Sequence, residues 1–190
     1  MIFLNKKPLP REFYLQNTTT VARKLIGKRL FRKLADGRII SGVIAETEAY
    51  LGESDTACHS RVGKTPRNKI MFGNGGFLYI YLIYGMYYML NIVTEGEGNA
   101  CAVLIRAVVD VKGFSSKETI DGPGKLCREF KITKEQYGVD VCRGNSIWIE
   151  RDKSFSKTTF FSLPRVGINY ASRADRQALL RFRMQSLKNS

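Results

Sequence analysis

The chain has 190 residues, with 31 Lys and Arg against 17 Asp and Glu, so its formal net charge is +14. This length predicts one domain over residues 1–190, large enough to bury a core without disulfides or metals. Hydrophobic residues make up 44% of the chain and charged residues 25%, which excludes a wholly disordered protein. The excess positive charge favours a polyanionic partner, either nucleic acid or an anionic membrane surface.

The basic residues gather at the two ends of the chain. Residues 1–40 hold ten Lys and Arg against two acidic residues, and residues 151–190 hold nine against two, whereas residues 41–150 are nearly neutral. Two solvated basic ends that only keep the protein soluble would give the same pattern. We favour a nearly neutral middle that carries a site, framed by ends that bind phosphates.

Turn residues and hydrophobic patterning predict the elements in chain order. Thr18-Thr19-Thr20 can cap a helix that reaches about residue 26, where Gly27 can end it. Two strands follow, joined at Asp36-Gly37, a dipeptide typical of hairpins. The strands are expected over 30–34, 39–50, 102–109, 147–149 and 165–170, with a further helix over 125–130. Because helices do not alternate regularly with strands, the fold class is α+β with mainly antiparallel strands.

Residues 77–93 carry no charged side chain, so by composition they resemble a membrane-spanning segment. Seventeen residues fall short of the roughly 20 that a spanning helix needs, and the segment contains five tyrosines, Gly85 and Asn91. We interpret it as a β-hairpin with strands over 77–83 and 86–93. Tyr84 then stands at the tip, where a bulky aromatic suits insertion into a base stack. The alternative is that all of these tyrosines belong to the core.

The cysteines and the single histidine argue against disulfides and zinc. The four cysteines form no C-x-x-C pair, and the apolar start of the chain is too short for a secretory signal. A cytoplasmic, reducing location is therefore expected. His59 is the only histidine, and its neighbour Cys58 would face the opposite side of an extended segment. A zinc site is therefore not expected.

Three polar side chains share one face of the predicted strand over 39–50. Glu46, Glu48 and Tyr50 are two residues apart, so their side chains point the same way. They mark either a strand end that emerges into solvent or a carboxylate at the edge of a cleft. Asn91 and Arg106 are polar residues within apolar strands, where a buried amide or charge needs partners.

Several strings of residues resemble the alkyladenine (3-methyladenine) DNA glycosylase family in its bacterial form. The resemblance runs from about Leu15 to Phe182, with matching order and approximate spacing, and it is looser after Arg165. Its strings are Glu46-Thr47-Glu48-Ala49-Tyr50-Leu51-Gly52, His59-Ser60, Thr65-Pro66-Arg67-Asn68, Met71-Phe72, Leu78-Tyr79-Ile80-Tyr81-Leu82-Ile83-Tyr84-Gly85-Met86-Tyr87 with Asn91, and Gly122-Pro123-Gly124-Lys125-Leu126-Cys127.

The resemblance implies a single mixed α/β domain with a curved antiparallel sheet and a protruding β-hairpin. It also implies an enzyme of base-excision repair that hydrolyses the N-glycosidic bond of damaged purines in duplex DNA. Alkylated purines of the 3-methyladenine type are the expected substrates, with hypoxanthine and ethenoadenine as further candidates. No lysine is placed to form a Schiff base with the sugar, so we expect a monofunctional glycosylase. The resemblance implies no metal and no cofactor. The expected partner is double-stranded DNA, without a membrane, and the protein is expected to be a monomer.

The same resemblance assigns a role to each candidate site residue. Glu48 is the general base that activates water, and Arg106 helps to hold that water and the carboxylate. Tyr50, His59, Tyr81 and Asn91 form the pocket for the flipped base, and Asn91 discourages guanine through its exocyclic amino group. Tyr84 fills the hole left in the duplex, and Arg67, Met86 and Tyr87 are candidates for further DNA contacts. Glu46 shares the strand face of Glu48 but has no assigned role, so Glu46→Gln is expected to have a much smaller effect.

Two other classes of protein remain open. A nucleic-acid-binding module without catalysis would use the same aromatics for stacking, with Glu48 incidental. A membrane-surface protein would use residues 77–93, although charged residues do not flank that segment as an interfacial helix requires. An oligonucleotide with one lesion separates the three classes, because they give excision, binding without excision, or neither.

Overall fold

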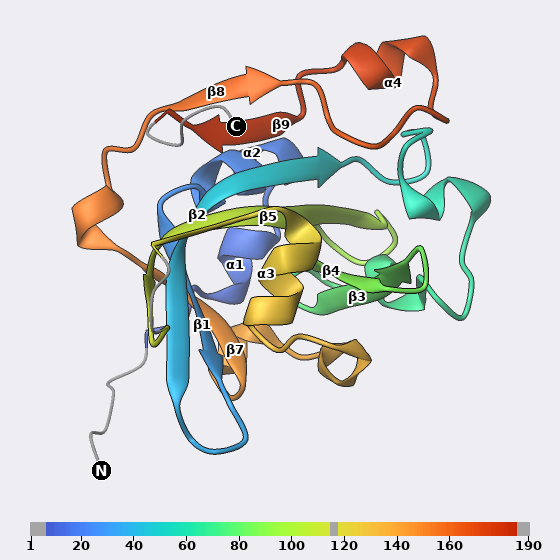
Figure 1. Ribbon diagram of the computed structural model, residues 1–190. Coiled ribbons are helices and arrows are strands. Elements are labelled where there is room, and N and C mark those ends of the chain that lie inside the picture. The colour runs from blue at the N-terminus through green and yellow to red at the C-terminus, as the bar shows by residue number, and fades with distance from the viewer. Residues whose placement is uncertain (1–6, 115–117, 186–190) are drawn as a thin grey trace.

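The computed structural model describes residues 7–114 and 118–185, which form one nine-stranded sheet with short helices against it (Figure 1). The strands are β1 (Lys28–Lys33), β2 (Ile39–Tyr50), β3 (Leu78–Ile83), β4 (Tyr87–Thr94), β5 (Cys101–Lys112), β6 (Thr119–Asp121), β7 (Ile147–Arg151), β8 (Phe160–Leu163) and β9 (Arg181–Met184). The α-helices in these ranges are α1 (Arg11–Tyr14), α2 (Thr18–Leu25), α3 (Pro123–Glu129) and α4 (Arg173–Gln177).

The two longest strands, β2 and β5, form the centre of the sheet. The main order is β3-β4-β5-β2-β1-β7, while β6 pairs with β5, and β9 pairs with both β2 and β8. All strand pairings in the described ranges are antiparallel. One edge of β2 is therefore shared, because β1 pairs with residues 39–43 and β9 with residues 46–48. The C-terminal part of β2 thus lies between β5 and β9.

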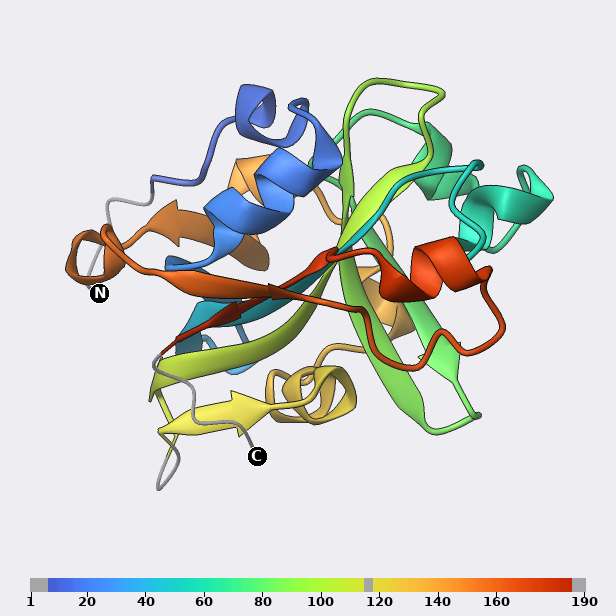
Figure 2. The ribbon, with the colours of Figure 1, turned by 90° about the horizontal axis from the view of Figure 1, so that it is seen from above.

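Helices cover both faces of the sheet. Figure 2 shows α2 on one side of the central strands and α3 on the other. Val21, Ala22 and Leu25 of α2 are fully buried, and the hydroxyl of Thr47 on β2 donates to the carbonyl of Ala22 at 3.0 Å. Thr47 therefore faces the part of the core that packs against α2, and the glutamates before and after it face the other side of the sheet.

The structure confirms most of the predicted elements. The helix over 18–25, the hairpin joined at Asp36-Gly37 and the hairpin of β3 and β4 are present, and the fold is α+β as expected. No helix among the described residues is long and apolar enough to cross a membrane. The cap of α2 differs from the prediction, because the Asn17 side chain accepts from the N–H groups of Thr19 and Thr20.

The strand predicted over 165–170 is wrong. That segment is a loop between β8 and α4, and the edge strands of the C-terminal part are β8 and β9 instead. The reason is that the Arg165 side chain is drawn into the protein interior, where it binds Asp55. A buried ion pair at this position outweighs the weak strand preference of Arg165-Val166-Gly167.

Candidate active site

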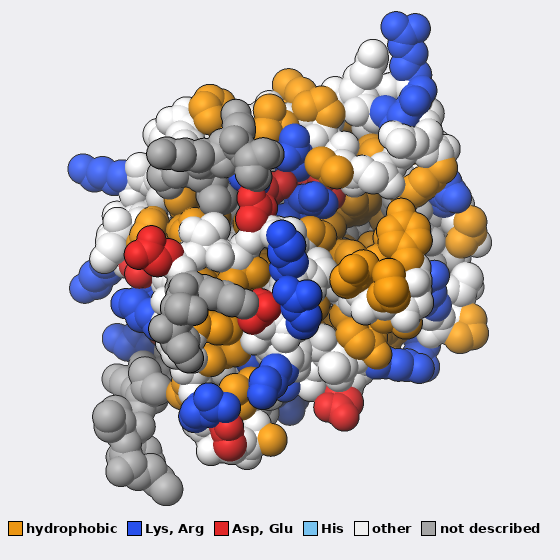
Figure 3. All heavy atoms as spheres, viewed as in Figure 1, with side chains coloured by type: hydrophobic (Ala, Val, Ile, Leu, Met, Phe, Trp, Pro, Cys, Tyr) orange, Lys and Arg blue, Asp and Glu red, His pale blue; other side chains and the backbone are white. Residues whose placement is uncertain are grey.

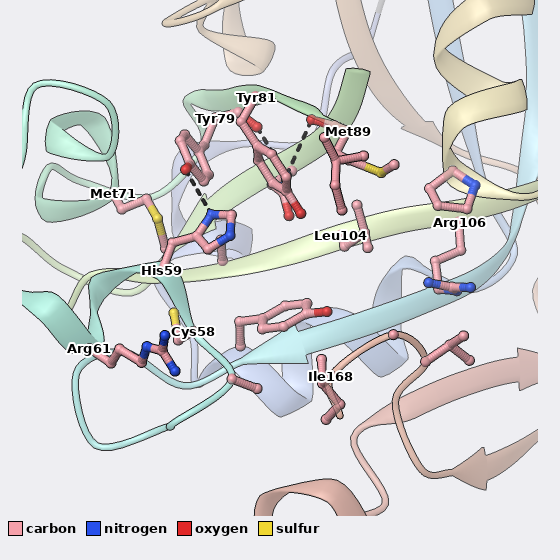
Figure 4. Close-up of a pocket in the computed structure, with 18 of the residues that line it drawn as sticks. Cys58, His59, Arg61, Met71, Tyr79, Tyr81, Met89, Leu104, Arg106 and Ile168 are labelled. Carbon is pink, nitrogen blue, oxygen red and sulfur yellow. Dashed lines mark hydrogen bonds between the residues drawn. The ribbon is translucent and has the colours of Figure 1, made fainter. Parts of the chain in front are cut away.

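A pocket of about 560 Å³ opens where β2, β3, β4 and β5 meet. Its walls come from the end of β2, the loop over 57–61, the hairpin of β3 and β4, the first residue of α3 and the loop over 166–170. In Figure 4, His59, Tyr79 and Tyr81 lie on one side of this pocket, Arg106 at its other end and Ile168 on the facing wall. The volume is in the range of small-ligand sites and suits a planar group of purine size.

Glu48 does not line the pocket itself but contacts Tyr50, Arg106 and Val166, which do, and none of its surface is exposed. Its Oε1 accepts from the Val166 N–H at 2.8 Å, and its Oε2 accepts from the Tyr50 hydroxyl at 2.9 Å. Arg106 adds an ion pair, with Nη1 at 3.3 Å from Oε2. A carboxylate offers about four lone-pair positions, so the two hydrogen bonds and the ion pair do not use all of them.

Burial raises the pKa of Glu48 above its ordinary value, while Arg106, the Val166 N–H and the Tyr50 hydroxyl oppose that rise. A carboxylate in water is a weak base at neutral pH. Because a higher pKa strengthens a base that is still ionised, the burial of Glu48 suits it for proton transfer.

A β-bulge places Arg106 beside Glu48. Glu46 pairs with Ala107 and Thr47 pairs with Ile105, so Arg106 has no residue opposite it on β2. The extra residue of a bulge can aim its side chain away from the regular alternation of the strand. The Arg106 guanidinium reaches Glu48 and also donates from Nε to Oε1 of Glu46 at 2.9 Å.

The rings of His59, Tyr79 and Tyr81 form the end of the pocket that lies opposite Arg106. His59 Nδ1 lies 2.9 Å from the Tyr79 hydroxyl, and the His59 ring meets the Tyr81 ring edge to face with centroids 4.5 Å apart. Burial, together with the charges of Arg67 and Arg61, lowers the pKa of His59 to about 4. His59 is therefore neutral at pH 7, and it presents one donor and one acceptor nitrogen.

Tyr50 is held by a buried ion pair. The Arg165 guanidinium lies 4.8 Å from the centre of the Tyr50 ring and binds both carboxylate oxygens of Asp55, at 2.5 and 2.9 Å. Arg165 also donates to the carbonyl of Ala49 at 2.9 Å. These bonds tie the loop after β8 to the end of β2, so they fix both the Tyr50 ring and the neighbouring Val166 N–H.

Asn91 lines the pocket from β4 and is held by backbone groups. Its amide nitrogen donates to the carbonyls of Tyr79 at 3.2 Å and Met89 at 3.3 Å. A buried amide is expected to find such partners, and they fix the orientation of this side chain.

The tip of the hairpin exposes the remaining predicted residues. Tyr84 is 80% exposed and adopts a φ of 53°, followed by Gly85 at 68°, a left-handed pair found in tight hairpin turns. Met86 and Tyr87 are also exposed. Figure 3 shows hydrophobic side chains gathered on the side of the molecule where this hairpin lies. Exposed Arg67 stacks its guanidinium on Tyr81, 5.1 Å from the ring centre.

The structure brings most of the predicted residues together. Those that line the pocket are Tyr50, His59, Tyr81, Tyr84, Asn91 and Arg106. Sequence reasoning missed Tyr79, although it shares the strand face of Tyr81 and could have been included on that ground. It also missed Val166, which acts through its backbone N–H and therefore leaves no signal in its residue type.

Metal ligands do not gather in the part of the chain that the structure describes. Within residues 7–114 and 118–185, no three His, Cys, Asp or Glu side chains lie close enough to hold a metal ion. The thiols of Cys58, Cys101, Cys127 and Cys142 are free.

The site thus combines a buried carboxylate, an aromatic pocket and an exposed aromatic tip. Comparison with known proteins identifies the class. The family model of methylpurine-DNA glycosylase (MPG) matches residues 12–188. The chain belongs to this family, and it is a DNA glycosylase, a hydrolase that acts on N-glycosyl bonds.

Three relatives illustrate how much of the chain the similarity covers. Each is named "Putative 3-methyladenine DNA glycosylase". The protein from Methanocella arvoryzae is 45% identical over 86% of each chain. Those from Ehrlichia chaffeensis and Legionella pneumophila strain Corby are 44% and 43% identical, over 85% and 93% of this chain and 86% and 93% of their own.

Proposed function

We propose that the protein begins base-excision repair by removing alkylated purines of the 3-methyladenine type from duplex DNA, with Glu48 as the general base. The observation that carries the proposal is the Glu48 carboxylate, which is fully buried and held by two hydrogen bonds and an ion pair to residues that line an aromatic pocket. The name shared by the relatives supports the class of substrate.

The target base is rotated out of the duplex before its sugar bond can be reached. The flipped purine then enters between Tyr50 on one wall and the group of His59 and Tyr81 on the other. Stacking on aromatic rings stabilises a bound base by roughly 1–3 kcal/mol. An N-alkylated purine carries positive charge, so the electron-rich tyrosine faces favour it over a neutral base.

The reaction is a hydrolysis at C1′ of the sugar. Glu48 accepts a proton from a water molecule, the water oxygen bonds to C1′, and the C1′–N bond breaks with its electron pair passing to the base. A cationic purine becomes neutral as it leaves, so it needs no acid, and one carboxylate suffices where O-glycosidases use two. Arg106 holds the ionised carboxylate in place.

The exposed hairpin tip is the part of the protein that we expect to enter the duplex. Tyr84 at the hairpin tip fills the space that the flipped base leaves, with Arg67, Met86 and Tyr87 as neighbouring contacts to DNA. Asn91, fixed by two carbonyls, discourages guanine at the pocket wall. Hypoxanthine and ethenoadenine form a second substrate class, and we expect them to be removed more slowly because neutral bases leave less readily.

The test is an excision assay. Duplex DNA methylated with dimethyl sulfate is incubated with excess protein, and the released bases are separated by chromatography. We expect 3-methyladenine in the supernatant and a strand that breaks only after alkali treatment. Strand cleavage without alkali would contradict the monofunctional mechanism. Binding to the methylated duplex without base release would favour the nucleic-acid-binding module.

A further inference from the structure

Glu46 is a second buried carboxylate close to Glu48, and the proposed reaction gives it no role. Only 2% of its surface is exposed, and it accepts hydrogen bonds from three arginines. Its Oε1 binds Arg106 at 2.9 Å and Arg181 at 3.2 Å, and its Oε2 binds Arg183. A buried carboxylate that served only stability would not need a partner that lines the pocket.

Two of the three arginines are themselves fixed. Arg181 donates from Nε to the carbonyl of Pro164 at 2.7 Å, and Arg183 donates to Oδ2 of Asp121 at 2.9 Å. The cluster therefore anchors Glu46 from the β9 side, and Arg106 approaches it from β5. Arg106 is the member of the cluster that also reaches the pocket and Glu48.

We infer that Glu46 is a positioning residue, which holds the Arg106 guanidinium against Glu48 while a flipped base occupies the pocket. This inference rests on the proposed role of Glu48. A long arginine side chain at the edge of a pocket is free to turn toward solvent or toward a DNA phosphate. The Nε bond to Glu46 restricts that freedom, since it holds the guanidinium with Nη1 3.3 Å from Oε2 of Glu48.

The pH dependence of excision distinguishes positioning from a simple charge effect. The groups that face Glu48 are Glu46 and Tyr50 on β2, Arg106 on β5, Tyr81 on β3, and Arg165 with the Val166 N–H from the loop after β8. The negative charge of Glu46 raises the pKa of Glu48, and the positive charge of Arg106 lowers it. Loss of the Glu46 charge alone would therefore move the acid side of the rate profile to lower pH, whereas release of Arg106 moves it to higher pH.

The experiment compares Glu46→Gln, Arg106→Met and the double variant in single-turnover release of 3-methyladenine between pH 5 and 8. We expect Glu46→Gln to slow excision at pH 7 by up to about 10²-fold, as a misplaced catalytic group does. The acid side of its profile should move to higher pH. In the Arg106→Met background the same substitution should change the rate little, because the two residues act as a unit.

Matched variants separate this inference from a general loss of folding. Asp140→Asn removes a partly buried carboxylate that binds Arg11, a pair that contacts neither glutamate and does not line the pocket. It should excise at the rate of the unchanged protein. If Glu46→Gln does not fold, Glu46→Gln with Arg181→Gln replaces it, since the pair removes one charge of each sign, and Arg181→Gln alone is its control.

The possible outcomes are distinct. An unchanged rate for Glu46→Gln, a profile that moves to lower pH, or effects of Glu46→Gln and Arg106→Met that simply multiply would each overturn the inference. Full excision by Glu48→Gln would instead overturn the proposed role of Glu48 itself. Loss of excision in Glu48→Gln with normal excision in Glu46→Gln would leave that role intact and reject only the positioning role.

Discussion

The backbone N–H of Val166 donates to Oε1 of Glu48 across 2.8 Å. The two residues are 118 positions apart in the chain, and the bond joins the loop after β8 to the end of the central strand β2. A backbone donor cannot rotate as a side chain does, so it fixes one edge of the carboxylate. Arg106 and Tyr50 fix the other edge through Oε2.

Glu48→Gln should abolish most of the excision activity. Glutamine keeps the size and much of the hydrogen bonding but cannot accept the proton, so the single-turnover rate should fall by the roughly 10²–10⁴-fold typical of a lost general base. Binding to methylated DNA, measured by fluorescence anisotropy, should persist. Glu97→Gln makes the same chemical change at an exposed turn and should excise normally. Equal rates for the two variants would refute the proposed mechanism.

Tyr84→Ser should weaken binding to damaged DNA selectively. The side chain is 80% exposed, so its loss should leave the fold intact but remove about 1–3 kcal/mol of stacking. Affinity for a duplex with a lesion should drop, while affinity for undamaged duplex stays nearly constant. Phe161→Ser, at an exposed aromatic on β8, is the control and should change neither affinity. An equal loss of affinity for both duplexes would show that Tyr84 does not fill the space left by a flipped base.

Stability should fall on acidification because of His59. The folded-state pKa of His59 is about 4, below its ordinary value of 6.5, so between these values the unfolded chain binds more protons than the folded protein. Acidification through this window therefore favours unfolding. Thermal melting from pH 7 to pH 4 should show a declining Tm, and the decline should be smaller in His59→Gln. If Tm falls equally with pH in the two proteins, the titration of another group causes the loss of stability.

Asp55→Asn should destabilise the protein strongly. The side chains of Arg165 and Asp55 are 0% and 2% exposed, so removal of one charge leaves the other buried without compensation. Loss of one partner of such a pair costs roughly 3–5 kcal/mol. Asp36→Asn breaks an exposed pair with Arg38, which solvent screens, so it should lower the free energy of unfolding far less. Urea unfolding measures both, and similar values for the two variants would contradict the buried character of the Arg165 pair.

DNA affinity should depend steeply on salt. The net charge is +14, and each phosphate contact adds about −0.9 to the slope of log K against log salt concentration. Titration of undamaged duplex between 50 and 200 mM salt measures the slope, for which we expect a value steeper than about −2. A shallower slope would mean that the basic ends of the chain do not bind phosphates.

The sequence by itself determined the local elements and the face that each side chain takes. The alternation of Glu46, Glu48 and Tyr50 places them on one side of β2, and the Tyr84-Gly85 turn follows from a glycine between two apolar, tyrosine-rich runs. These features depend on neighbours along the chain, and the period of a strand is enough to predict them. The motifs of the chain also indicate its family.

Only the tertiary structure decided what each polar side chain on that face meets. The bulge at Arg106 depends on how β2 and β5 pair, and the register of two distant strands is not encoded in either strand alone. Arg181 and Arg183 reach Glu46 because β9 pairs with the end of β2, and Arg165 turns inward because Asp55 is buried there. The sequence alone therefore gives Glu46 no role beside Glu48. In the fold both glutamates bind Arg106, because contact across strands is set by packing.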